Sequence, residues 1–209
     1  MTNKEYLKML AEADENTIKR LICMSESNVE NDTSSNLQCW EMDRTTVTQL
    51  VVPEGVTKIG SHAFWGCQKL KSLIIKGNVK SIGDGAFDDC SCLTSLNIEE
   101  GVESIGRGAF SFCTALKSLV IPEGLTNIGF SAFYNCKKLT SLIIPKSVTS
   151  IGHDAFCYCP KKCDIQIAKT KMQVLTMDFY PWGINNGAVV HCIDGDLIVG
   201  ELTVQNRFN

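Results

Sequence analysis

Several signals that mark membrane, secreted and nucleic-acid-binding proteins are missing from this sequence. It contains no run of about 18 apolar residues, which argues against a membrane-spanning helix. The N-terminus, MTNKEYLKMLAEADEN, lacks the continuous apolar core of a secretory signal, so we expect a cytoplasmic protein. No basic run of about five or six residues occurs and the formal net charge is −3, which argues against nucleic acid as a partner.

Residue patterns that carry catalysis or cofactor binding are also scarce. No glycine-rich phosphate loop is present, because the recurring glycines belong to a different pattern described below. The three histidines, His62, His153 and His191, belong to no catalytic motif, and a cysteine nucleophile would need a base within hydrogen-bond reach. We therefore predict no catalytic residue, no cofactor and no enzymatic activity.

Metal-capable side chains gather in the C-terminal part of the chain without the spacing of a zinc site. They are His153, Cys157, Cys159, Cys163, His191 and Cys192. Zinc sites favour closed sets of closely spaced cysteine pairs, whereas Cys159 belongs to a recurring column that should point inward and divide this set. Asp194 and Asp196 are explained by an Asp-Gly turn rather than by calcium, so we predict no metal site.

The sequence does contain one 23-residue unit that is repeated five times in tandem. The units begin at Val56, Val79, Val102, Leu125 and Val148. With 209 residues, of which 44% are hydrophobic and 21% charged, the composition is typical of a soluble folded protein. A fixed period of this length predicts a solenoid of stacked coils, in which each coil buries its apolar residues against its neighbours.

Three columns of residues define the inside of a coil. They are an Ile-Gly pair (Ile59-Gly60, Ile82-Gly83, Ile105-Gly106, Ile128-Gly129, Ile151-Gly152), a phenylalanine (Phe64, Phe87, Phe110, Phe133, Phe156) and a cysteine (Cys67, Cys90, Cys113, Cys136, Cys159). The glycine predicts either a positive φ or coils that approach too closely for a Cβ. The cysteines are expected to be reduced and to act as small buried apolar residues, although coils about 4.8 Å apart bring them near bonding distance.

The pattern Leu-x-x-Leu-x-Ile that follows the cysteine predicts one short strand in each coil. In Leu119-Val120-Ile121, alternation places Leu119 and Ile121 inward and Val120 outward. Residues 47–52 supply a first strand ahead of the five units, in register with the strand of the first unit. We therefore expect six strands side by side.

The outward positions of these strands form two columns that are the candidate binding face. They are Ser72, Ser95, Ser118 and Ser141 in one column, and Val51, Ile74, Asn97, Val120, Ile143 and Gln166 in the other. Repeat consensus and strand propensity would also produce these columns without any ligand. Six strands offer roughly 400 Å², about half of one partner's share of a standard interface, so weak binding is expected. Loop positions Trp65, Phe112, Phe130 and Tyr134 are the next candidates.

The repeat, Leu-x-x-Leu-x-Ile-Pro-x-x-Val-x-x-Ile-Gly-x-x-Ala-Phe-x-x-Cys, resembles that of the BspA-like leucine-rich repeat family across residues 47–168. This family occurs in bacteria, some protists and bacteriophages. The resemblance implies an α/β leucine-rich-repeat solenoid, right-handed and curved, with a parallel sheet on its concave face. It also implies adhesion or protein binding rather than catalysis. The fifth unit departs from the pattern at Lys162, as expected of a terminal repeat.

Residues 1–46 and 169–209 lie outside the solenoid and predict structures at its ends. Helical periodicity over residues 3–27 predicts two short helices that either cap the first coil or dock a partner, followed by a polar linker. In the C-terminal segment, strands at 188–193 and 196–199 flank an Asp194-Gly195 hairpin turn, and the aromatic stretch 179–183 is expected to plug the last coil. This tail resembles the ends of BspA-like proteins of intestinal Firmicutes and their phages, which implies a C-terminal cap.

Two functions remain open. The first is a non-enzymatic scaffold that binds an unknown protein partner through the concave face. The alternative is a structural or assembly protein, a homo-oligomer or phage-particle component, in which the solenoid is a spacer. With these functions, the cell surface or a phage particle is the alternative to a cytoplasmic location.

Overall fold

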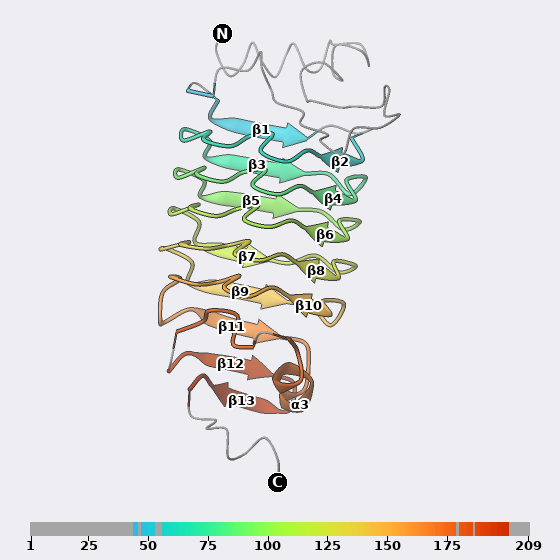
Figure 1. Cartoon of the computed structure of the whole chain (residues 1–209), viewed down its shortest axis with the longest axis vertical. Coiled ribbons are helices and arrows are strands. Elements are labelled where there is room, and N and C mark those ends of the chain that lie inside the picture. The colour runs from blue at the N-terminus through green and yellow to red at the C-terminus, as the bar shows by residue number, and fades with distance from the viewer. Residues whose placement is uncertain (1–43, 46, 53–55, 179, 186, 201–209) are drawn as a thin grey trace.

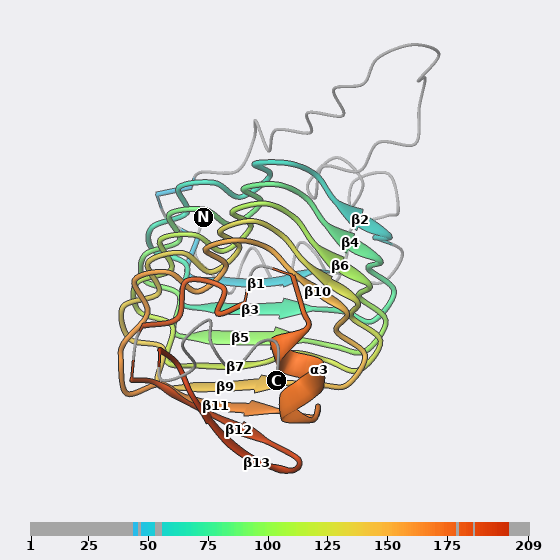
Figure 2. The same cartoon turned by 60° about the horizontal axis from the view of Figure 1, so that its bottom comes forward.

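The computed structural model describes residues 44–45, 47–52, 56–178, 180–185 and 187–200, so the helices predicted over 3–27 lie outside the described residues. The described chain is a stack of coils, each of which adds one strand to each of two parallel arrays (Figure 1). The first array contains β1 (Gln49–Val52), β3 (Ser72–Ile75), β5 (Ser95–Ile98), β7 (Ser118–Val120), β9 (Ser141–Ile144) and β11 (Asp164–Ile167). The second contains β2 (Lys58–Ile59), β4 (Ser81–Ile82), β6 (Ser104–Ile105), β8 (Asn127–Ile128) and β10 (Ser150–Ile151). The two arrays lie on different sides of the stack (Figure 2).

Register and alternation in the first array follow the prediction. Leu50 of β1 lies opposite Leu73 of β3 in a parallel pairing. Leu119 and Ile121 are buried, while Val120 between them is 58% exposed. The second array was not predicted, because a strand of two residues is too short to show alternation.

Pairing in the first array stops between β5 and β7, so the six predicted strands are present but belong to two sheets. β1, β3 and β5 form one sheet, and β7 starts another that continues to the C-terminal end. Leu96 of β5 is only half-buried, whereas the equivalent Leu73 is fully buried. Pro122, which has no N–H, stands where Glu99 donates to the carbonyl of Ile75 in the coil before. It does not by itself end the pairing, because Pro145 stands at the equivalent position of the next coil and β7 still pairs with β9. The second array runs unbroken from β2 to β10 across this point.

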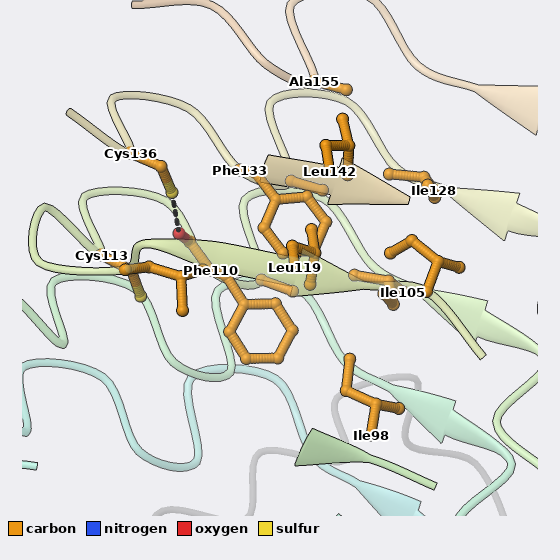
Figure 3. Packing of buried hydrophobic residues seen from close by; sticks show 14 of the residues in the cluster. Ile98, Ile105, Phe110, Cys113, Leu119, Ile128, Phe133, Cys136, Leu142 and Ala155 are labelled. Carbon is orange, nitrogen blue, oxygen red and sulfur yellow. Dashed lines mark hydrogen bonds between the residues drawn. The ribbon is translucent and has the colours of Figure 1, made fainter. Parts of the chain in front are cut away.

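The phenylalanine column forms a continuous ring stack through the core. Neighbouring ring centroids are 5.0 to 5.6 Å apart and their planes lie within 6° of each other, in the offset geometry that aromatic pairs prefer. Figure 3 shows Phe110 and Phe133 of this stack between the strand leucines and isoleucines. The cysteine column is buried beside it, and every described cysteine is a free thiol. Each ring of the column therefore packs on the ring of the next coil, so neighbouring coils bury each other's apolar side chains.

The glycine column is required by close approach of the coils and not by a positive φ. A Cβ on Gly129 would lie 2.6 Å from the carbonyl carbon of Gly106, and one on Gly83 would lie 2.7 Å from the carbonyl carbon of Gly60. Positive φ occurs instead two and six residues later in each coil, as at Ser131 and Asn135. Glycine is therefore obligatory only where backbones of neighbouring coils touch.

The C-terminal segment continues the first array with two further strands. After the short helix α3 (Lys171–Leu175), β12 (Val189–Cys192) pairs in parallel with β11, and β13 (Gly195–Ile198) pairs antiparallel with β12. Trp182 is fully buried. The backbone carbonyl of Trp182 accepts the N–H of Phe156 at 3.0 Å. In the other coils, the phenylalanine N–H donates instead to the carbonyl of the alanine in the next coil. Residues 180–184 therefore imitate part of a sixth coil.

Candidate functional site

The predicted outward columns lie in register along the candidate face, on both sides of the break after β5. Ser72 faces Ser95 and Ile74 faces Asn97 on one side; Ser118 faces Ser141, and Val120, Ile143 and Gln166 align on the other. Val51 and Ile74 are half-buried, whereas Val120 and Ile143 are 58% and 39% exposed. Exposed apolar surface on this face is therefore concentrated in the C-terminal half.

A groove of about 1000 Å³ hollows this C-terminal half. It is lined by residues of β5, β7, β9, β11 and β12 and of the turns that follow them, so it crosses the break in the sheet. Val120, Ile143 and Gln166 of the predicted column line it, while Val51, Ile74, Asn97 and the four serines do not. Three of the ten predicted residues therefore line the groove, and Pro122, Pro145 and Ile193 contribute further apolar surface to it.

The charged residues that line the groove are mostly acidic. Four carboxylates, Glu99, Glu100, Glu123 and Asp164, belong to its walls, and no lysine or arginine does. Glu99 is partly neutralised by Lys76, whose Nζ lies 3.1 Å from its Oε1. Glu100 and Glu123 are exposed and pair with none of the described cations. Sequence analysis missed the three glutamates because they follow the strands, where no alternation marks a face, whereas Asp164 is the first residue of β11.

At the end of the groove, His191 joins three strands. Its Nδ1 lies 2.8 Å from Oδ1 of Asp196 on β13, and its Nε2 lies 3.4 Å from Oδ1 of Asp164 on β11. These contacts fix the imidazole between two carboxylates, and they tie the hairpin to the last repeat. Asp196, which sequence analysis assigned to a turn, therefore also orients a groove residue.

The cysteines and histidines near residues 153–163 do not converge. Among the described residues, no group of three or more His, Cys, Asp and Glu side chains is arranged to hold a metal ion. Cys159 and Cys163 are buried, whereas His153 is exposed and its Nδ1 lies 2.9 Å from Asp154. Burial raises the pKa of Cys163 to about 12 and also raises the pKa of Cys157, which opposes thiolate formation at neutral pH.

The repeats match a family model along most of their length. Residues 38–162 match the model described as a BspA type leucine rich repeat region, in six copies. The chain belongs to the BspA-type leucine-rich repeat family. The match begins before the first predicted unit at Val56, so it includes β1. It ends at residue 162, so the resemblance of the tail to proteins of gut bacteria and phages stays a prediction.

Solved structures share the fold of this BspA-type chain. A leucine-rich repeat protein of T. pallidum is 28% identical with a TM-score of 0.53, over 59% of this chain and 62% of that one. One from Eubacterium ventriosum is 30% identical with a TM-score of 0.53, over 63% and 34% of the two chains. The pneumococcal vaccine antigen PcpA is similar in fold alone, at 20% identity and a TM-score of 0.51, over 61% and 37%. The chain therefore spans less than two thirds of each relative, and no curated protein matches it.

No helix among the described residues has the length and apolar character needed to cross a bilayer. The cytoplasmic location predicted from the N-terminus has no support in these comparisons. The family is a repeat scaffold of the kind used in protein interactions.

Proposed function

We propose that this BspA-type chain is a non-enzymatic scaffold that holds an extended segment of a protein partner in the groove at the C-terminal half of its concave face. The observation that carries this proposal is the groove itself, whose floor exposes the apolar side chains of Val120 and Ile143. Exposed apolar side chains gathered in a hollow are typical of interaction sites. The acidic wall adds a preference for segments that carry lysine or arginine.

The dimensions suit a short strand-like segment. From β5 to β12 the groove crosses five strands, or roughly 19 Å at about 4.8 Å per interval. An extended peptide of about six residues covers that length at roughly 3.3 Å per residue. Such a contact is smaller than the roughly 800 Å² that each partner buries in a standard interface, so we expect micromolar rather than nanomolar affinity.

A displayed peptide library, selected on the folded protein, tests the groove directly. The double variant Val120→Lys/Ile143→Lys places two cations on the groove floor and should abolish binding of the selected peptides. The matched control, Asn127→Lys/Met172→Lys, adds the same charge at exposed positions outside the groove and should leave binding unchanged. Peptides that bind the groove variant as well as the wild type would show that the groove is not the site.

We also propose that residues 169–200 act as the C-terminal cap of the scaffold. Solenoid ends need a cover because the terminal coil has no neighbour to bury its apolar face. Burial of Trp182 and its bond to Phe156 support this role.

The alternative of a self-assembling protein rests on the hairpin edge. β13 is the outermost of the described strands of its sheet. Ile198 in this strand is 37% exposed, and Ile193 in the turn before it is 69% exposed. Edge strands of this kind can pair with another chain. Light scattering over a range of protein concentrations distinguishes the two functions, because a monomer at all concentrations excludes the homo-oligomer.

A further inference from the structure

The loops that lead into β7, β9 and β11 form a strongly basic surface. We call residues 111–117, 134–140 and 157–163 the lysine flank. It carries five exposed lysines, Lys117, Lys137, Lys138, Lys161 and Lys162, and no aspartate or glutamate. None of the five forms an ion pair with a described residue. The neighbouring carboxylates Asp154 and Asp164 are instead occupied by His153 and His191.

The three loops of the lysine flank are directly stacked. The N–H of Phe112 donates to the carbonyl of Tyr134 at 2.8 Å, and the N–H of Asn135 donates to the carbonyl of Cys157 at 2.7 Å. The loops follow one another along the side where the strands of the first array begin, at the left of Figure 1. Sequence analysis missed this surface, because the lysines lie one repeat apart and form no basic run.

An aromatic ladder runs along the same loops. The ring centroids of Phe112 and Tyr134 are 5.6 Å apart, and those of Tyr134 and Tyr158 are 5.1 Å apart. Phe112 and Tyr158 are 42% and 63% exposed, so core packing does not explain their size. Each ring stands within five residues of a lysine of the flank.

Two of these rings occupy a backbone conformation that large side chains avoid. Phe112 and Tyr158 have φ of 56° and 61°, in the left-handed region. The equivalent positions of the other coils hold Gly66, Asp89 and Asn135, residue types that adopt this region at less cost. A strained, exposed aromatic side chain points to a role on the surface rather than to stability.

We propose that the lysine flank binds single-stranded nucleic acid, with its phosphates on the lysines and its bases on Phe112, Tyr134 and Tyr158. Exposed rings beside an unpaired cationic track are the combination by which proteins hold single strands without sequence preference. The net charge of −3 does not oppose this, because the lysine flank itself holds no carboxylate. Carboxylates border it at one end, where Asp89 donates its N–H to the carbonyl of Ser111.

The lysines favour this ligand over a neutral polysaccharide, which could stack on the rings but would gain nothing from the positive charges. Successive ring planes are inclined by 53° and 76°, and bases can stack on all three because each turns independently about its backbone. A polyphosphate would use the lysines but gain nothing from the rings. The site lies outside the peptide groove, so this proposal stands or falls independently of the proposed function.

The test is a fluorescence anisotropy titration of the whole chain with a labelled oligothymidylate of about 15 nucleotides, long enough for a stacking site of this kind. Three or four phosphate contacts predict a logarithmic salt slope of about −2 to −3, or roughly 15- to 60-fold weaker binding on going from about 50 to about 200 mM salt. A duplex of the same length should bind more weakly, because its bases are already stacked.

Two matched variants separate rings from charges. Phe112→Asn/Tyr158→Asn installs the residue that Asn135 already provides at this position, and should weaken binding about 10- to 100-fold with an unchanged salt slope. Lys137→Gln/Lys161→Gln should reduce the salt slope by about 1 to 2, whereas Lys58→Gln/Lys146→Gln, with the same net charge, should not.

Each result decides the proposal. Loss of oligothymidylate binding in the ring variant, retained in the lysine control and in Val120→Lys/Ile143→Lys, supports it. Absence of binding at about 50 mM salt overturns it. Two further results also overturn it. Binding that is unchanged in the ring variant would indicate nonspecific attraction to lysine. Tighter, ring-dependent binding of heparin would make the ligand an anionic glycan.

Discussion

The thiol of Cys136 donates to the carbonyl oxygen of Phe110 in the preceding coil, across 3.6 Å (Figure 3). The same bond joins Cys90 to Phe64, Cys113 to Phe87 and Cys159 to Phe133, at 3.4 to 3.5 Å. The carbonyls of Phe64, Phe87 and Phe110 also accept the N–H of the cysteine in their own coil. The column therefore needs a side chain that is small, apolar and able to donate one weak hydrogen bond, which is the chemistry of a thiol.

Serine should be a poor replacement in this column. The shorter C–O bond of Cys113→Ser moves the donor away from the Phe87 carbonyl and buries a more polar group, so we expect a loss of about 1 to 3 kcal/mol in the free energy of unfolding. Chemical denaturation measures this loss. Cys92→Ser, at an exposed position, is the control and should change stability by less than about 0.5 kcal/mol. Equal effects at the two positions would contradict the assigned role.

Thiol chemistry should distinguish the same two classes of cysteine. Burial raises the pKa of Cys67 to about 11, and it raises the pKa of Cys90 and Cys113 further, so little thiolate exists in the column near pH 8. We expect a maleimide reagent to label Cys92 in the folded protein and the column only after denaturation. Melting should be the same with and without reductant. Several disulfides in protein from its natural source, detected by mass spectrometry, would instead indicate an exported protein.

The repeat columns could be predicted because each follows from one period and one alternation. Burial of Phe110, exposure of Val120 and the pairing of Leu50 with Leu73 all depend on a register that recurs every 23 residues. The break between β5 and β7 could not be predicted from the sequence, because it depends on how neighbouring coils pack against each other. The groove could not be predicted either, since its wall residues Glu99 and His191 come from turns and from the C-terminal segment.

The glycine column supplies a prediction with an internal contrast. Gly129→Ala introduces a Cβ at 2.6 Å from the backbone of the preceding coil, so the coils must separate and the melting temperature should fall by several degrees or more. Asn135→Gly, at φ of 61°, enters a conformation that glycine accepts freely and should change stability by less than about 1 kcal/mol. Differential scanning calorimetry compares them. A harmless Gly129→Ala would mean that the coils are not in close contact there.

Trp182 provides the sharpest test of the C-terminal cap. Its indole is fully buried, and its Nε1 donates to the carbonyl of Asp178 at 3.1 Å. Trp182→Ala should therefore lower the free energy of unfolding by about 3 to 5 kcal/mol, the cost of deleting a large buried aromatic side chain. Met172→Ala, which truncates a 68% exposed side chain in the same segment, should cost less than about 0.5 kcal/mol.

Deletion of residues 169–209 goes further, because it removes the cover of Phe156 and leaves the Phe156 N–H without its Trp182 partner. We expect this truncated protein to aggregate or to lose its cooperative melt, whereas an unchanged melting temperature would identify the segment as an appendage.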